Sequence, residues 1–206
     1  MRQSMKDKVS VGVLVSGGGT NLQAIIDAVN SGIIKSAKVE LVISNNPGAY
    51  ALTRAEKNSI KTAVITKKES GSPEEFERRI IESLENAGID LIVLAGFMSI
   101  LSKNFTDRFK DRIINVHPAL IPSFCGEGFY GLKVHEAALK KGVKVTGATV
   151  HFVNEIPDGG KIIMQKAVEV HEGDTPEILQ KRVMEEAEWK ILPLSIEKIS
   201  KEILGE

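Results

Sequence analysis

The sequence predicts an α/β protein with a doubly wound, mostly parallel sheet. In the first half of the chain, short apolar segments alternate with stretches that place apolar residues at helical spacing. A glycine-rich turn, Ser16 to Thr20, follows the first apolar segment, as in Rossmann-like halves that bind phosphate at a strand end. Near the C-terminal end, two longer segments alternate apolar and polar residues, which predicts an antiparallel strand pair.

The first half is expected to supply the parallel strands. Each expected strand is a run rich in Val, Ile and Leu that a turn signal ends. The runs cover residues 9–15, 39–43, 62–65, 91–95 and 113–116. Between them, Asn21 can cap a first helix, residues 49–57 predict a second, and Ser72 with Pro73 opens a third.

The pattern changes after residue 120. The expected elements there are a Pro/Gly-rich loop over 121–131, a helix over 132–140, and antiparallel strands over 145–153 and 162–170. A turn around Pro157–Gly160 joins the strands, and Thr175 opens a terminal helix that Pro193 kinks or restarts. We expect one domain over residues 1–206, with a phosphate-binding half over about 9–120 and a second half over about 121–206.

The composition argues against several classes of partner. Lys and Arg together number 27, as do Asp and Glu, so no surplus of charge favours nucleic acid or an anionic membrane. No apolar segment is long enough to cross a membrane without charges, and Met1–Lys8 is polar, with no signal-peptide pattern behind it. Cys125 is the only cysteine, so no internal disulfide can form, and a cytoplasmic location is expected.

The most informative motif is Asn115-Val116-His117-Pro118, together with a second motif later in the sequence, Asp158-Gly159-Gly160. Residues i and i+2 of an extended segment point to the same face, so Asn115 and His117 address one small volume. A carboxylate at Asp158 is expected to hold the imidazole protonated near neutral pH. The three groups suit acyl transfer, because one can bind an oxyanion, one can move protons and one can tune the proton mover.

These residues also have purely structural interpretations. Asp158 alone is simply a turn residue, because Asp-Gly is common in hairpin turns. Its functional role depends on a proximity to His117 that the sequence does not establish. We expect His151 to be a satisfied inner-face histidine rather than a catalyst, His135 to bind only its own loop, and His171 to be exposed. The histidines and the single cysteine lack the spacing of a metal site, so no structural metal is expected.

The glycine-rich turn favours anion binding. A strand, such a turn and then a helix direct backbone N–H groups and a helix N-terminus at one point. No Gly-Lys-Ser/Thr follows, so the turn is not a P-loop, and Leu22 stands where a dinucleotide fingerprint needs its third glycine. The alternative is a tight turn that requires a positive φ.

Several motifs share an order with a known family. Ser16 to Ile25 is followed by Leu94-Ala95-Gly96-Phe97-Met98, Asn115 to Phe124, Val150-His151-Phe152-Val153 and Asp158-Gly159-Gly160. From Val9 to about Pro193 the chain resembles the phosphoribosylglycinamide formyltransferases, a folate-dependent family of purine synthesis. The Asn-x-His-Pro and Asp-Gly-Gly elements are common to enzymes that use 10-formyltetrahydrofolate, whereas the Ser-Gly-Gly-Gly-Thr-Asn-Leu turn points to this family.

The resemblance implies roles for these residues. Asn115, His117 and Asp158 would be catalytic. Glycinamide ribonucleotide would be bound by Gly19, Thr20, Asn21, Pro118, Glu185 and Glu188, with its phosphate on backbone amides. The co-substrate 10-formyltetrahydrofolate would be bound by Met98, Ser99, Ile100, Leu101, Asn115, Asn154, Glu155, Ile156, Pro157 and Asp158. The resemblance also implies no metal, no partners beyond these small molecules, and a monomer or weak homodimer.

The chain departs from the family pattern in several places. Family members often carry arginine after the Phe-Met pair, where this chain has Ser99, and a second arginine expected near the glutamate tail of folate falls at Pro73. Lys67 or Lys68 is expected to substitute. The loop over residues 125–131 is longer than the shortest family loops, and the terminal helix holds one extra residue near its tryptophan.

The motifs leave rival activities open. Methionyl-tRNA formyltransferase should carry a further C-terminal RNA-binding domain, and formyltetrahydrofolate hydrolase an N-terminal regulatory domain. We expect neither, since the first strand begins at about Val9 and the chain ends at Glu206. A non-catalytic phosphate-binding module would use only the glycine-rich turn. The expected chemistry is direct attack of the substrate amine on the formyl carbon through a tetrahedral intermediate.

Overall fold

A computed structural model describes residues 7–206, so most of the polar segment Met1–Lys8 lies outside the described residues. Within this part, seven strands form one sheet in the order β3-β2-β1-β4-β5-β6-β7. The strands are β1 (Val9–Val15), β2 (Ala37–Ser44), β3 (Lys61–Val64), β4 (Leu91–Leu94), β5 (Ile113–His117), β6 (Val145–Phe152) and β7 (Ile162–Glu169). β1 to β5 pair in parallel, and β6 is antiparallel to both β5 and β7. The predicted fold class is confirmed.

The helices follow the predicted order, with additions. They are α1 (Thr20–Asn30), α2 (Tyr50–Lys57), α3 (Lys67–Ser70), α4 (Pro73–Asn86), α5 (Lys103–Arg108), α6 (Leu132–Lys141), α7 (Pro176–Val183), the π-helix η1 (Met184–Glu188) and α8 (Trp189–Leu204). The sequence analysis does not predict α3, α5 or η1. Both α3 and α5 are short and begin after a capping side chain, Thr66 and Ser102 respectively.

The expected cap of the first helix is wrong. The N-cap of α1 is Gly19, whose φ of 72° is left-handed, and Asn21 lies inside the first turn. A Cβ on Gly19 would lie only 2.6 Å from the Cβ of Ala51, so the close approach of α2 requires glycine there. The amide of Asn21 donates instead to Oε2 of Glu188 at 2.8 Å. Tertiary contacts therefore override the local capping signal.

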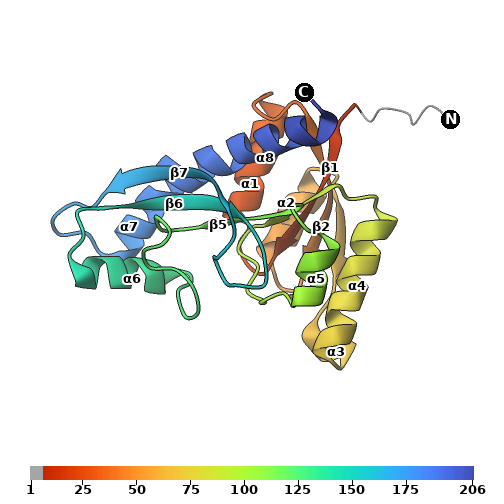
Figure 1. Cartoon of the computed structure of the whole chain (residues 1–206), viewed down its shortest axis with the longest axis horizontal. Helices are drawn as coiled ribbons and strands as arrows, with labels where there is room; N and C mark the ends of the chain where they lie inside the picture. The colour runs from red at the N-terminus through yellow and green to blue at the C-terminus, as the bar shows by residue number, and fades with distance from the viewer. Residues whose placement is uncertain (1–6) are drawn as a thin grey trace.

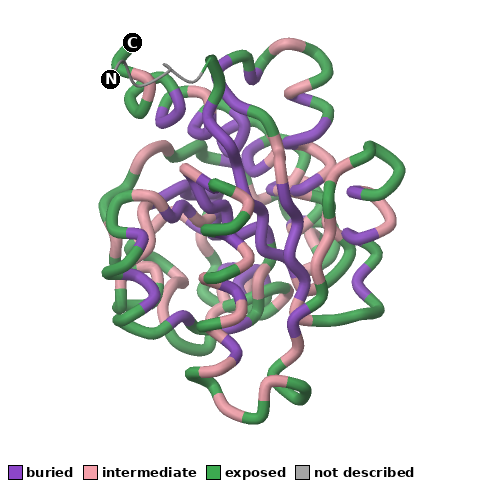
Figure 2. Tube along the Cα trace, turned by 90° about the vertical axis from the view of Figure 1, so that its right-hand side faces the viewer, coloured by how far each residue is buried: buried purple, intermediate pink, exposed green. Residues whose placement is uncertain are grey.

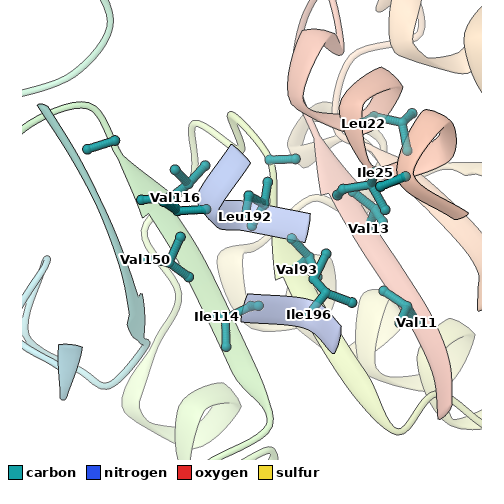
Figure 3. Close-up of a cluster of buried hydrophobic side chains, with 14 of the residues drawn as sticks. Val11, Val13, Leu22, Ile25, Val93, Ile114, Val116, Val150, Leu192 and Ile196 are labelled. Atoms are coloured by element: carbon teal, nitrogen blue, oxygen red, sulfur yellow. The ribbon is translucent and has the colours of Figure 1, made fainter. Parts of the chain in front are cut away.

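Helices cover both faces of the sheet (Figure 1). On one face, α1 and α8 pack against the central strands. Figure 3 shows Leu22 of α1 and Leu192 of α8 in one cluster with side chains of β1, β4 and β5. On the other face, α4 and α5 contribute Phe76 and Phe105 to a second buried cluster. Across residues 7–206, no helix combines the length and apolar character needed to span a bilayer.

The carboxyl ends of β1, β4 and β5 lie side by side, because these strands are adjacent and parallel. The chain is buried along the central strands and exposed in many of the loops around them (Figure 2). The glycine-rich turn follows β1, and Asn115 and His117 end β5. The topology therefore brings both predicted motifs to the edge where open α/β sheets bind ligands.

The C-terminal helix changes type before Pro193. The π-helix η1 lies between α7 and α8, and Pro193 lies inside α8, so the predicted restart at Pro193 is wrong. A π-helical turn closes i→i+5 hydrogen bonds and so holds more residues than an α-helical turn. η1 therefore lies where the sequence analysis expects one extra residue, immediately before Trp189.

Candidate active site

The tip of β5 carries the predicted amide and imidazole. Asn115 and His117 are two residues apart in an extended strand, so their side chains share one face. β5 pairs with β6 in a register that sets Asn115 opposite His151. The amide nitrogen of Asn115 lies 3.3 Å from Nε2 of His151. The structure thus adds a second imidazole to the expected pair.

The carboxylate of Asp158 joins this group from the loop between β6 and β7. Its Oδ2 lies 3.4 Å from Nδ1 of His117, and its Oδ1 lies 3.4 Å from Nε2 of His151. The backbone N–H of Gly126 donates to Oδ2 at 2.9 Å. Asp158 has a left-handed φ of 56°, which Asp tolerates better than most residues. The structure therefore brings Asn115, His117 and Asp158 together.

Backbone carbonyls determine which ring nitrogens carry hydrogen. Nε2 of His117 lies 2.8 Å from the carbonyl oxygen of Phe124, and Nδ1 of His151 lies 2.8 Å from that of Phe152. A carbonyl oxygen only accepts, so these two nitrogens carry the hydrogens. When the rings are neutral, Nδ1 of His117 and Nε2 of His151 are lone-pair nitrogens, and both face Asp158. Nδ1 of His117 can therefore accept a proton on the side that faces Asp158.

Burial dominates the electrostatics of His117. It lowers the pKa of His117, against the raising effects of Asp158 and the Phe124 carbonyl, and His151 lowers it further. The expectation that Asp158 holds this imidazole protonated near neutral pH is wrong, because desolvation of the ring outweighs the carboxylate. Burial also raises the pKa of Asp158, but the contact with His151, the hydrogen bond from the backbone N–H of Gly126 and the nearby His117 leave it below its usual value. The site thus pairs a neutral imidazole with a carboxylate.

The glycine-rich turn is braced from two sides. Arg54 of α2 donates from Nε to the carbonyl of Gly18 at 2.8 Å and from Nη1 to Gln23 of α1 at 3.0 Å. The backbone N–H of Met98, after β4, donates to Oγ of Ser16 at 2.9 Å. No side chain caps the N-terminus of α1, so its first amides are open to an anion. The guanidinium of Arg54, which the sequence analysis missed, adds positive charge beside this turn.

The two expected substrate glutamates have different surroundings. Glu185 is exposed, and its carboxylate lies 3.8 Å from the ammonium of Lys181. Glu188 is buried against α1, where Asn21 donates to its Oε2. Burial raises the pKa of Glu188 to about 7, against the lowering effect of the Asn21 hydrogen bond. A carboxyl group that exchanges a proton near neutral pH therefore lies beside the glycine-rich turn.

Comparison with known proteins identifies the family. Residues 9–196 match the formyl transferase family model. Phosphoribosylglycinamide formyltransferase of Haemophilus influenzae is 44% identical over 186 residues, which cover 90% of this chain and 84% of that protein. The chain belongs to the phosphoribosylglycinamide formyltransferase family.

Two further relatives agree with this membership. Glycinamide ribonucleotide transformylase 1 of Symbiobacterium toebii has a TM-score of 0.89 at 38% identity, covering 97% of this chain and 94% of that one. The trifunctional purine biosynthetic protein adenosine-3 of Gallus gallus is 44% identical over 194 residues. Those residues are 94% of this chain but only 19% of the trifunctional protein, so the chain matches one part of it.

The candidate site opens into two cavities, whose shared lining residues are Phe97, Ser99, Ile100, Asn115, Pro157 and Asp158. The smaller, of about 140 Å³, is also lined by His151 and by the expected folate residues Ile100, Leu101, Asn154, Glu155, Ile156 and Pro157. The larger, of about 690 Å³, is lined by His117 and by the expected residues Met98 and Pro118. Gly19, Thr20 and Asn21 line neither cavity. The expected folate residues after β4 and in the β6–β7 loop therefore gather around Asn115 at the end of β5. The glycine-rich turn lies next to Met98, whose backbone N–H donates to Ser16.

His151 is the main residue of the candidate site that the sequence analysis assigned to the core. It is buried, as expected, but its Nε2 faces Asn115 and Asp158. Only the pairing of β6 with β5 places His151 beside Asn115, and the sequence analysis does not predict that pairing. His171 is exposed, as expected.

His135 of α6 has no loop partner, contrary to expectation. It is fully buried, and among the described residues neither ring nitrogen has a hydrogen-bond partner. Burial, with a smaller effect of His117, lowers the pKa of His135 to about 4. The unfolded chain therefore binds a proton at this position between about pH 6.5 and pH 4, where the folded protein does not.

His135→Met is expected to flatten the acid loss of stability. The wild type should lose about 3 kcal/mol through His135 between pH 7 and pH 4, since the folded pKa lies below the unfolded one. Methionine fills a similar apolar space and does not titrate, so the variant should lose that much less. Urea unfolding at both pH values measures the difference. Parallel losses in the two proteins would show that His135 is not buried in the neutral form.

Proposed function

We propose that this chain transfers the formyl group of 10-formyltetrahydrofolate to the amino group of N1-(5-phospho-D-ribosyl)glycinamide in purine nucleotide synthesis. The observation that carries the proposal is the meeting of Asn115, His117 and Asp158 at the end of β5, beside a cavity large enough for a ligand. The Haemophilus influenzae relative bears the name of this activity, and the present chain spans most of its length. The balanced charge supports small-molecule partners and the single cysteine a cytoplasmic location, and the proposed assembly is a monomer or weak homodimer.

The acceptor phosphate would bind the amides of Gly19, Thr20 and Asn21. These amides belong to the N-cap and the first two residues of α1. The helix N-terminus and Arg54 give the turn a positive potential. The ribose hydroxyls would meet Glu188, which can accept or donate a hydrogen bond because its pKa is about 7. The glycinamide amine would then extend along the end of β4, past Pro118, to the cluster at β5.

The folate would place its pterin in the smaller cavity. Ile100, Leu101 and the loop from Asn154 to Asp158 line this cavity. A few polar groups in an otherwise apolar cavity suit the donor and acceptor edges of a pterin. The formyl group would then lie near Asn115, which lines both cavities.

The chemistry follows from the hydrogens assigned above. The neutral amine attacks the formyl carbon, and a tetrahedral oxyanion forms that an N–H of the Asn115 amide stabilises. The amine proton passes to the lone pair at Nδ1 of His117, whose other nitrogen is held by Phe124. Asp158 stabilises the imidazolium so formed, and Nδ1 returns the proton to the folate nitrogen as its bond to the formyl carbon breaks. His117 ends neutral, and no covalent enzyme intermediate forms.

Competing acceptors test the proposal. Purified protein is given 10-formyltetrahydrofolate with glycinamide ribonucleotide, initiator methionyl-tRNA or water, and the formylated products are quantified. Transfer to glycinamide ribonucleotide should exceed the other two by at least about a hundredfold, as expected when one acceptor fits a positioned site. Formyl-methionyl-tRNA as the main product, or formate released at the same rate without an acceptor, would instead support one of the rival activities.

A further inference from the structure

The wall of the larger cavity that faces away from β4 comes from the segment between β5 and α6 and from the first turn of α6. It consists of residues 126–131 and Lys133, and the opposite wall consists of residues 96–100. The apolar lining includes Met98, Ile100 and Tyr130, which are exposed large hydrophobic residues of this chain. A flat apolar group would therefore find contacts on both walls.

The charges of this cavity are few. Its lining holds the carboxylates of Asp158 and Glu127 and the imidazole of His117. Among the described residues that line it, Lys133 is the one with a permanent positive charge. An anionic group that enters this cavity therefore has one obvious counter-ion.

The described lining residues of the β4 wall, 96–100, include no cation. Ser99 stands there, and its hydroxyl accepts a hydrogen bond from the amide of Asn45 at 3.1 Å. Lys67 and Lys68, the expected substitutes, line neither cavity, and the ammonium of Lys67 lies 5.7 Å from the centre of the Phe76 ring. A tail carboxylate next to β4 must find its charge partner on the opposite wall.

Lys133 is held in place by Tyr130. Its ammonium lies 2.8 Å from the tyrosine hydroxyl and 4.4 Å from the ring centre, and its backbone N–H donates to the carbonyl of Tyr130 at 3.2 Å. Lys133 is also in the first turn of α6, whose N-terminus has no side-chain cap. The helix end and the ammonium thus give this side of the cavity a positive potential.

We propose that Lys133, positioned by Tyr130, binds a carboxylate of the glutamate tail of the folate substrate. The inference rests on the proposed function and names the tail contact of that same site. The two cavities share Ser99, Ile100 and Pro157, so a folate whose pterin fills the smaller one extends into the larger. Its aminobenzoyl ring lies between Ile100 and Tyr130, and its anionic tail reaches Lys133.

A pair of folates, one with and one without the tail, tests this assignment. The probes are 10-formyl-5,8-dideazafolate and the corresponding pteroate, which lacks the glutamate. Lys133→Ala should raise the KM for the glutamate-bearing probe about tenfold, as for loss of a charge-assisted hydrogen bond. The KM for the pteroate and for glycinamide ribonucleotide should change less than twofold. Tyr130→Phe, which keeps the ring and removes the hydroxyl, should raise the KM for the first probe by a smaller factor.

Matched variants complete the design. Lys140→Ala removes an exposed lysine from the same helix outside the cavity and should leave every constant unchanged. Equal effects of Lys133→Ala on both folates, or an effect on glycinamide ribonucleotide alone, overturn the proposal. So does a tail-dependent loss in Lys67→Ala or Lys68→Ala with none in Lys133→Ala. Equilibrium dialysis of both probes gives Kd values without turnover, so failure of the tail contact is distinguished from failure of the proposed reaction.

Discussion

Asp158→Asn is expected to lower kcat by about a hundredfold to a thousandfold without disturbing the fold. Asparagine has nearly the same shape and tolerates the left-handed φ of 56° at this position. The change removes the negative charge that favours the imidazolium form of His117, whose Nδ1 lies 3.4 Å away. The amine proton then has no stabilised acceptor. Steady-state formyl transfer to glycinamide ribonucleotide measures the loss.

The pH profile of Asp158→Asn separates an electrostatic role from a structural one. Without the carboxylate, the pKa of His117 falls further, so the acid limb of kcat/KM should move to lower pH. Asp111→Asn is the matched control, because Asp111 also has a positive φ, 58°, and precedes β5 rather than ending the site loop. It should behave as wild type. Normal turnover in Asp158→Asn, with an unmoved acid limb, would falsify the role assigned to this carboxylate.

Asn115→Ala is expected to lower kcat by a similar factor, on the order of a hundredfold to a thousandfold. One hydrogen of the Asn115 amide points to Nε2 of His151, which orients the side chain and leaves the second hydrogen for the oxyanion. Because the oxyanion exists only after attack, the KM values for both substrates should change by less than about threefold.

The control for Asn115→Ala is Asn104→Ala, an exposed asparagine on α5 that lines neither cavity. It should retain wild-type kcat. A variant at Asn115 that raises KM and keeps kcat would mean that the amide binds the ground state of a substrate rather than the oxyanion. His151→Gln offers a further check, since it weakens the orientation of Asn115 and should lower kcat by less than the loss of the amide itself.

Local patterns predicted the parts of the site that depend on one strand. The two-residue spacing of Asn115 and His117 fixes their common face in any extended segment, and the structure has it. The order of apolar segments predicted adjacent parallel strands, which brings the end of β1 and the end of β5 to one edge. Periodicity and turn chemistry determine these features, so one sequence was sufficient.

The remaining parts of the site depend on distant segments. His151 enters because β6 pairs with β5 in one particular register, and a shift of one residue would turn its side chain to the other face. The low pKa of His117 depends on how completely the folded chain excludes water from the ring. Gly19 rather than Asn21 begins α1 because Ala51 of another helix lies close by. Local sequence patterns do not predict any of these contacts, because each joins segments that are distant in the sequence.

The wide turn of η1 determines the direction in which the side chains of α8 point around the helix axis. Successive residues of an α-helix are rotated by about 100°, so one additional residue in a regular helix would swing all later side chains by that angle. Leu192 and Ile196 would leave the buried stripe, and Glu188 would leave Asn21. Because a π-helical turn holds more residues than an α-helical one, η1 sets the rotation at which α8 begins and so turns Leu192 and Ile196 toward the sheet.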